Sequence, residues 1–160
     1  MTTELTTDLV WQEVEKQLFA VLGMVTAKNE ARTVGIVYAV HQHRLYITTK
    51  RTAWKTRHIS QNPHVSLTIP IAKRIPLMPW IKIPAATITF SGTATIHEPS
   101  EVAPELLHKL FRGLETNADM LADTSIIAVE PMGDFVTYGV GVSLMTMRDT
   151  EKSRGRVPVS

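Results

Sequence analysis

The chain has 160 residues, of which 44% are hydrophobic and 20% charged, with a formal net charge of +2. This length and composition are typical of one soluble globular domain. Cysteine is absent, which excludes disulfides, thiolate metal sites and thiol nucleophiles and favours a cytoplasmic location. We see no signal-peptide pattern and no apolar run of the ~18 residues that suggest a transmembrane helix, so we expect no membrane partner.

The chain begins with a helical pattern and continues with β-rich segments. Apolar residues recur at helical spacing behind Thr7 and Asp8, which predicts a helix over residues 8–20. The clearest strand is Ala86–Ile96, in which Thr or Ser alternates with other residues at a period of two. The predicted strands are Val21–Ala27, Thr33–Val40, His43–Thr49, His64–Ile71, Ala85–His97, Ser125–Glu130 and Phe135–Met147.

Turns and short helices separate these strands. Hairpin turns are predicted near Lys28-Asn29-Glu30, near His41-Gln42 and at Pro131-Met132-Gly133. Two further helices are predicted over Thr52–Ser60 and Pro104–Leu114. Six or seven short strands with few helices indicate a mainly β fold, a closed or partly open antiparallel barrel.

The domain organisation follows from these elements. We expect one barrel domain with an N-terminal helix over residues 1–148 and a polar C-terminal tail over residues 149–160. The tail is expected either to be mobile or to become ordered against a partner.

A local run of positive charge suggests an anion site. Lys50, Arg51, Lys55 and Arg57 lie within eight positions with no acidic residue among them. The run is either an anion-binding loop or a solvated basic turn, and its residues alone leave both interpretations open.

The order of motifs between residues 32 and 67 points to a known family. Arg32-Thr33-Val34 opens a strand, a second strand ends in Thr48-Thr49, Lys55 follows in a short helix, and Asn62-Pro63 opens the next strand. This order resembles the pyridoxamine 5′-phosphate oxidase-like family. The resemblance implies an FMN-binding split β-barrel of six or seven mostly antiparallel strands, working as a homodimer with the flavin at the interface.

The resemblance also implies which residues hold the cofactor. Thr49, Thr52 and Lys55 are expected to converge on a phosphate at the helix N-terminus, with Arg51 adding a second positive charge. The strand that begins at Arg32 is expected to face the flavin ring. The cofactor-binding residues implied in this way are Arg32, Thr33, Val34, Thr48, Thr49, Arg51, Thr52, Trp54, Lys55 and Thr87.

The sequence departs from the family pattern in several places. The family's Ser-Arg-Lys phosphate motif reads Ala53-Trp54-Lys55 here, and Trp54 either stacks on an aromatic ligand or is a surface or interface aromatic. The insertion Ile75–Pro84 lines a hydrophobic substrate pocket or packs at the dimer interface. The substrate-phosphate cluster of the vitamin-processing enzymes has no convincing counterpart, so we do not expect pyridoxamine phosphate oxidation.

Two functional hypotheses follow. The first is a flavin-dependent oxidoreductase that acts on a small apolar or aromatic substrate, with catalytic residues unknown because the flavin carries the chemistry. The second is a non-catalytic module for a deazaflavin coenzyme, haem or another planar ligand. Nucleic acid ranks lower because the basic run is short, and no metal site is expected because no recognisable ligand spacing occurs.

Overall fold

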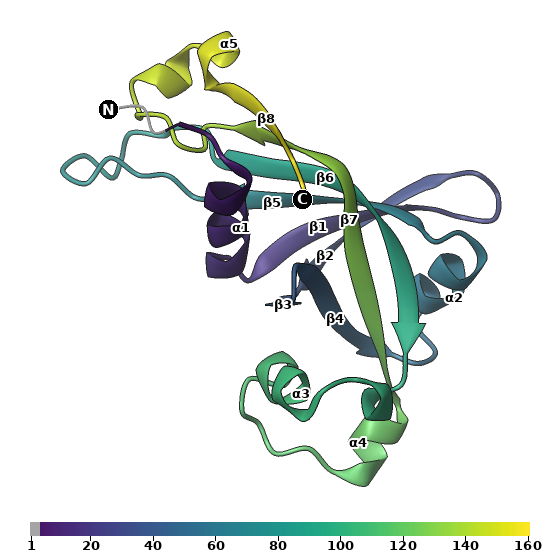
Figure 1. The fold of residues 1–160 in the computed structure, drawn as a ribbon. Coiled ribbons are helices and arrows are strands. Elements are labelled where there is room, and N and C mark those ends of the chain that lie inside the picture. Colours follow the sequence, from purple (N-terminus) through teal and green to yellow (C-terminus); the bar gives the residue numbers. More distant parts are fainter. Residues whose placement is uncertain (1–3) are drawn as a thin grey trace.

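The computed structural model describes residues 4–160, which fold around one antiparallel β-sheet that curls into a split barrel (Figure 1). The strand order is β2-β1-β5-β6-β7-β4-β3, and β8 pairs with β7 off this path. The mainly β split-barrel fold predicted from the sequence is confirmed. The strands are β1 (Phe19–Val25), β2 (Ala31–Val37), β3 (Ala39–His41), β4 (Arg44–Lys50), β5 (His64–Ile71), β6 (Ala86–His97), β7 (Thr124–Tyr138) and β8 (Arg154–Pro158).

Short helices connect and cover the strands. Among residues 4–160 they are α1 (Thr7–Lys16), α2 (Trp54–Gln61), α3 (Pro104–Leu110), α4 (Ala118–Ala122) and α5 (Thr150–Ser153), with 3₁₀ turns η1 (Pro99–Glu101) and η2 (Thr146–Arg148). The predicted helix over Thr52–Ser60 corresponds to α2. The helix predicted from Pro104 ends at Leu110 rather than Leu114, because Arg112 and Gly113 adopt positive φ angles of 53° and 71°.

Helix α1 begins where the sequence predicted but ends earlier. The hydroxyl of Thr6 caps it by accepting the N–H of Leu9 at 3.2 Å. It ends at Lys16, so the prediction of a helix to residue 20 is wrong. The chain enters β1 at Phe19, and the later apolar positions that continued the helical pattern alternate between the two faces of this strand instead.

The inner face of the sheet carries the core. In β6, Ala86, Ile88 and Phe90 are buried while Thr87 and Thr89 are half-exposed, as the period-two pattern predicts. The fully buried side chains of the core come from many strands and include Leu22, Leu45, Ile47, Leu67, Ile69, Ile127 and Phe135.

Both early hairpin turns are confirmed. Asn29 has a φ of 62° in the β1–β2 turn, which the Thr26 N–H closes by donating to the C=O of Glu30 at 2.9 Å. Gln42 and His43 have φ angles of 49° and 56° in the β3–β4 turn. Two successive positive φ values match the twist of an antiparallel pair, so β4 begins after His43 rather than at it.

The prediction of a hairpin at Pro131-Met132-Gly133 is wrong. One continuous strand, β7, replaces the two predicted strands, and its pairing with β6 shifts register between Thr89 and Ser91. Such a shift is a β-bulge, which bends a strand without ending it. The strand ends at Tyr138 instead of Met147, because Gly139 turns the chain at a φ of 73°.

Residues 149–160 form α5 and β8, and β8 pairs with β7 of the same chain. The Arg156 guanidinium reaches Asp134 at 3.1 Å, and the Trp11 indole N–H donates to the C=O of Val159 at 2.9 Å. The division of the chain at residue 148 stays a prediction, but the segment after it is ordered on the barrel.

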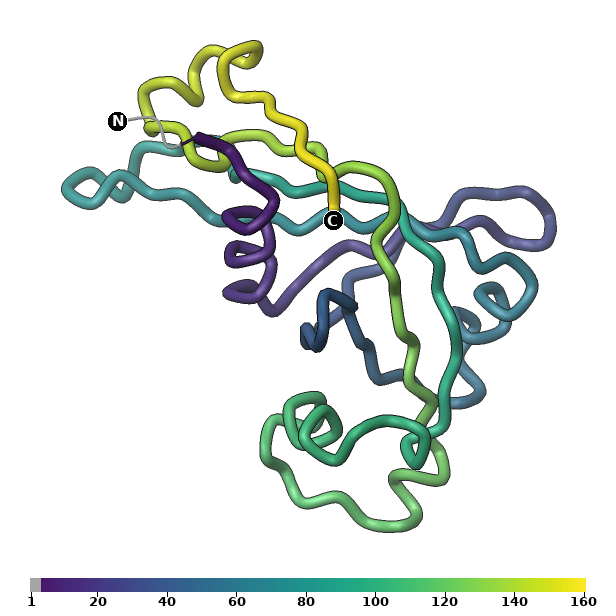
Figure 2. Tube along the Cα trace, in the orientation of Figure 1, coloured from purple at the N-terminus to yellow at the C-terminus, as the bar shows by residue number. Residues whose placement is uncertain are grey.

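Two excursions leave the barrel at opposite ends. The loop between β5 and β6, residues 72–85, projects from one end, while α3 and α4 lie at the other (Figures 1 and 2). None of the helices between residues 4 and 160 is long and apolar enough to cross a membrane.

Candidate functional site

The predicted phosphate-binding residues lie where β4 ends and α2 begins. Thr48 and Thr49 lie near the C-terminal end of β4, and both side chains are half-buried. The backbone N–H of Ala53 donates to the C=O of Lys50 at 3.0 Å, and this tight turn leads straight into α2. The strand-end hydroxyls and the first turn of α2 are thus held within one short segment.

The N-terminus of α2 lacks the groups that normally satisfy a helix end. Ala53 is the N-cap and offers no side-chain acceptor, and the first turn contains no acidic residue. Lys55 lies in this turn, half-buried, and Arg57 follows it. Because a helix N-terminus has free N–H groups and partial positive charge, cations here are unfavourable unless an anion joins them. The donor set therefore suits a phosphate group.

Arg51 is engaged elsewhere. Its two terminal nitrogens donate to both carboxylate oxygens of Glu98, and its Nε donates to the C=O of Ala122 at 3.0 Å. The hydrogen bonds from Arg51 hold the pKa of Glu98 below its usual range, and the same contact raises the pKa of Arg51. Arg51 thus ties the β4–α2 turn to the segments that flank α3 and α4. Lys50 and Lys55 take part in no ion pair within residues 4–160.

The side chains of Thr52 and Trp54 are exposed beside this turn. The Trp54 ring meets the edge of His58 at a centroid distance of 5.7 Å and an interplanar angle of 64°. This contact orients the indole on the surface of α2 and leaves part of its area open to a ligand or a partner.

Arg32, Thr33 and Val34 lie on β2, the strand next to this segment. Because β3 continues β2 after one residue and pairs antiparallel with β4, β2 runs beside β4 at the open edge of the barrel. Thr33 is exposed, Val34 is half-buried, and Arg32 contacts Glu30 at 2.8 Å. Arg32 and Thr33 line an open groove of about 460 Å³ over β1, β2, β5 and β6.

Thr87 lies apart from the other predicted residues. It pairs with Pro70 and Tyr138 at the start of β6, next to the projecting loop. Since β5 separates β6 from β1 in the sheet, Thr87 does not join the β2 and β4 residues within one chain.

A groove of about 600 Å³ runs between α3 and the strands β2 to β4. Thr48 lines it and also lines a neighbouring hollow of about 410 Å³ with Thr49 and Lys50. Lys109 and Arg112 supply positive charge on the opposite wall, and Lys109 Nζ donates to the C=O of Val40 at 2.9 Å. Sequence reasoning missed these two cations, because only the folded position of α3 brings them beside β4.

The phenol of Tyr38 also lines this groove but is not available as an acid or base. It donates to the C=O of Val14 at 2.6 Å, and burial raises its pKa. Its role is therefore to hold α1 against the barrel.

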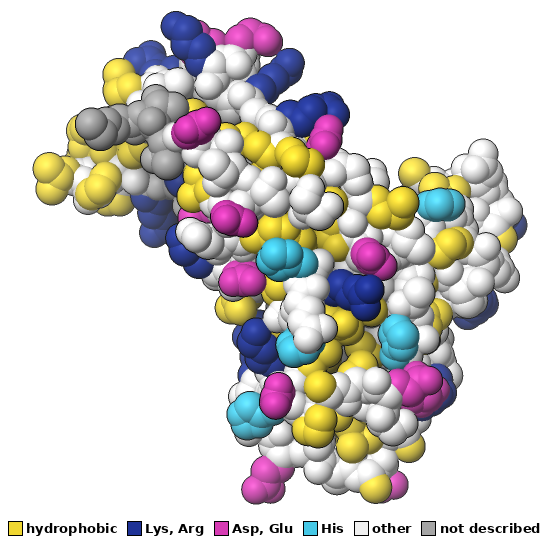
Figure 3. All heavy atoms as spheres, in the orientation of Figure 1, with side chains coloured by type: hydrophobic (Ala, Val, Ile, Leu, Met, Phe, Trp, Pro, Cys, Tyr) yellow, Lys and Arg dark blue, Asp and Glu magenta, His cyan; other side chains and the backbone are white. Residues whose placement is uncertain are grey.

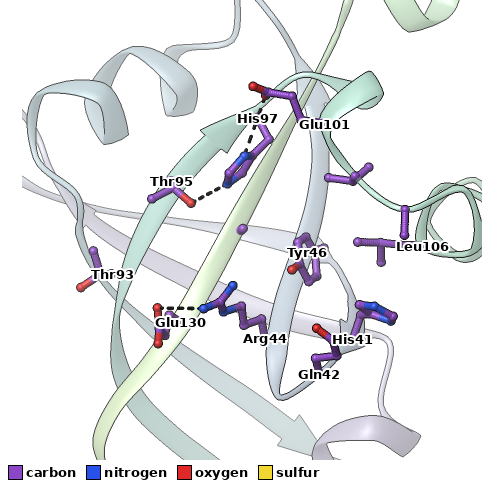
Figure 4. Close-up of a pocket in the computed structure, with 13 residues that line it drawn as sticks. His41, Gln42, Arg44, Tyr46, Thr93, Thr95, His97, Glu101, Leu106 and Glu130 are labelled. Atoms are coloured by element: carbon purple, nitrogen blue, oxygen red, sulfur yellow. Dashed lines mark hydrogen bonds and ion pairs between the residues drawn. The ribbon is translucent and has the colours of Figure 1, made fainter.

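A second pocket, of about 550 Å³, lies between the β3–β4 hairpin, β6, β7 and α3 (Figure 4). His97 accepts or donates a hydrogen bond with Thr95 at 2.8 Å, and its other ring nitrogen lies 3.9 Å from Glu101. Across the pocket, Arg44 lies 3.5 Å from Glu130. The lining thus offers polar groups of both signs to a small polar ligand. No sequence pattern predicted this pocket, since its residues come together only through the β4–β7–β6 strand order.

Comparisons with known proteins agree with this fold. The curled sheet and its strand order define a split β-barrel protein. The profile of the family described as pyridoxamine 5′-phosphate oxidase matches residues 6–133. The chain belongs to this family, and the resemblance read from the sequence is confirmed. A search of curated proteins found no match.

Solved structures show the same fold. An F420 reductase has a TM-score of 0.56 and 24% identity, covering 83% of this chain and 97% of its own. The haem storage protein HutZ from Vibrio cholerae has a TM-score of 0.65 and 16% identity, covering 86% and 98%. A haem-binding protein from Mycobacterium smegmatis has a TM-score of 0.65 and 12% identity, covering 99% and 60%.

Proposed function

We propose that the chain binds FMN by its phosphate and acts as a flavin-dependent oxidoreductase on a small apolar or aromatic substrate. The observation that carries this proposal is the N-terminus of α2, which has no side-chain cap and no acidic residue but carries Lys55. Membership of the pyridoxamine 5′-phosphate oxidase family supports it.

In this proposal the cofactor is held by two groups of residues. Thr49, Thr52, Lys55 and the first N–H groups of α2 bind the phosphate, while Arg51 positions the turn through Glu98. Thr48 and the β2 segment that begins at Arg32 lie against the ring, and Trp54 adds an aromatic surface. When bound, FMN supplies the hydride or electron transfer.

We also infer a homodimer with the cofactor at the interface. Phe19 and Val37 pair across β1 and β2, and both are exposed, as is Leu18 beside them. Neighbouring exposed apolar residues of this kind are typical of a protein interface. In such a dimer, Thr87 of one chain would contact the flavin ring that is held by the β2 and β4 residues of its partner. The lack of cysteine supports a cytoplasmic location.

The second candidate function is a non-catalytic binding module for a deazaflavin coenzyme, haem or another planar ligand. The F420 reductase and the two haem proteins among the similar folds favour it. The absorption spectrum of the purified protein separates the ligands, because flavin, deazaflavin and haem absorb at different wavelengths.

The test is a fluorescence titration of the purified protein with FMN and, separately, with the deazaflavin coenzyme. We expect micromolar or tighter binding of FMN, weakened at least tenfold by Lys55→Ala, which corresponds to about 1.4 kcal/mol. Lys28→Ala is the matched control, since Lys28 is an exposed cation in the β1–β2 turn. Deazaflavin binding alone would favour the second candidate. Binding of neither ligand, or equal losses in both variants, would overturn the phosphate site.

A further inference from the structure

The loop between β5 and β6 has a defined shape. Two successive turns build it, the first closed by Met78 N–H donating to the C=O of Ile75 and the second by Ile81 N–H donating to the C=O of Met78, both at 3.1 Å. Prolines restrict the backbone further and are Pro76, Pro79 and Pro84. Residues 72–85 therefore project as a preformed element rather than as a plain connection (Figures 1 and 2).

The end of this loop is apolar and open to solvent. Leu77 is 87% exposed and Trp80 is 73% exposed, with Met78 and Ile81 also exposed. We name these four residues the apolar tip. Large apolar side chains that gather on one exposed element mark an interaction surface, because isolated ones are the normal case.

Positive charge flanks the apolar tip on both sides in the chain. Lys73, Arg74 and Lys82 flank it in the chain, and we name them the cationic collar; none of them forms an ion pair within residues 4–160. Residues 31–97 contain nine Lys or Arg and no Asp or Glu, so no acidic residue near in sequence offsets the collar. Figure 3 shows hydrophobic side chains at this projecting end with Lys or Arg beside them.

We propose that this loop docks on an anionic lipid surface, with the apolar tip inserted at the headgroup boundary and the cationic collar on the phosphates. Trp and aliphatic side chains are favoured at that boundary, and Lys and Arg are attracted by anionic headgroups. The expectation of no membrane partner rested on the lack of a spanning segment, which surface docking does not need.

The charges argue against the same loop of a second copy as the occupant. A twofold contact of loop on loop would bring two cationic collars together, and interface cores are depleted in Lys. The loop is also not a cover for the α2 turn of its own chain. The loop leaves the C-terminal end of β5 at Ile71, whereas α2 leads into its N-terminal end at His64. The seven residue steps from His64 to Ile71 span roughly 23 Å.

A second segment at the same end of the sheet agrees with docking. Tyr138, the last residue of β7, pairs with Thr87 just after the loop, so the chain beyond β7 emerges beside it. Met145 on that segment is also highly exposed. Met145 thus adds an exposed apolar side chain outside the loop, on the segment that follows β7.

The test is cosedimentation of the purified protein with vesicles of phosphatidylcholine alone and of phosphatidylcholine with phosphatidylglycerol. We expect binding to the mixed vesicles only, weakened by salt. Replacing the collar by Lys73→Gln, Arg74→Gln and Lys82→Gln together should reduce partitioning on the order of a hundredfold, about fivefold per cation. Leu77→Ser with Trp80→Ser should reduce it about tenfold or more.

Matched controls keep the result specific. Leu114→Ser removes a side chain that is also 73% exposed but lies between α3 and α4 at the far end, and it should bind as the native protein does. Brominated phosphatidylcholine should quench tryptophan emission in the native protein and not in Trp80→Phe.

Absence of binding to mixed vesicles, or equal loss in Leu114→Ser, would overturn the proposal. So would conversion of a dimer to a monomer by the tip variant, because a second copy would then cover the tip. None of these measurements depends on flavin affinity, so failure of the docking proposal can be distinguished from failure of the proposed function.

Discussion

Replacing Trp11 with Phe tests whether the C-terminal segment is part of the folded core. The indole is only 3% exposed, and its N–H donates to the C=O of Val159 at 2.9 Å. It stacks on His43 at a centroid distance of 4.4 Å and meets the edge of Phe135 at 5.2 Å. One side chain thus joins α1, the β3–β4 turn, β7 and the chain end.

The size of the effect follows from these contacts. The lost hydrogen bond costs about 1 kcal/mol, and the smaller ring leaves a void that costs roughly 1–2 kcal/mol more. We therefore expect Trp11→Phe to lower the free energy of unfolding by about 2–3 kcal/mol. For a chain of this length that corresponds to a fall in Tm of roughly 5–10 °C.

The assay is urea denaturation followed by far-ultraviolet circular dichroism, which does not depend on tryptophan. A second background lacking residues 159–160 completes a double-mutant cycle. In that background the acceptor is gone, so Trp11→Phe should cost about 1 kcal/mol less. A loss below roughly 0.5 kcal/mol in the full chain, or the same loss in both backgrounds, would refute the idea that Trp11 anchors the chain end.

Two further predictions concern the strand contact at Gly92 and the ion pair at Arg51. A Cβ at Gly92 would lie 2.7 Å from the C=O of Glu130, so Gly92→Ala should destabilise the protein by roughly 1–3 kcal/mol in the same assay; a neutral effect would contradict the close approach of β6 and β7. Because Arg51 lowers the pKa of Glu98, the carboxylate stabilises the fold above its unfolded pKa of about 4.3, and this stabilisation is lost as pH falls through the folded pKa. The Tm difference between native protein and Glu98→Gln should thus be present at neutral pH and vanish in acid, and a difference independent of pH would count against the pair.

Local patterns predicted much of the fold. The alternation in Ala86–Ile96 defines β6 because a strand with one buried face must repeat every two residues. The β7 bulge was not predictable in the same way. Pro131 and Gly133 have the composition of a turn, and only pairing with β6 shows that the strand continues past them.

In the candidate site too, features built from neighbouring residues were predictable, and those built from residues distant in the chain were not. The basic run Lys50–Arg57 and the threonines before it are adjacent in sequence, so their place in one segment at the β4–α2 turn was predictable. The capture of Arg51 by Glu98 was not, since the partner lies 47 positions away in the chain. Lys109, Arg112 and the pocket around His97 were missed for the same reason: their neighbours come from other strands.

The net charge is small, but charge is unevenly distributed along the chain, since residues 31–97 contain nine Lys or Arg and no Asp or Glu. Three of the nine cations in residues 31–97 meet acidic residues from outside that stretch, at Glu30, Glu98 and Glu130. The other six form no ion pair within residues 4–160 and gather in two places, the α2 turn and the β5–β6 loop; they are Lys50, Lys55, Arg57, Lys73, Arg74 and Lys82. Since β5 separates these places, the two anion-attracting surfaces should respond independently to substitution. Lys55→Ala should therefore leave vesicle binding intact, and the collar variant should leave flavin affinity intact.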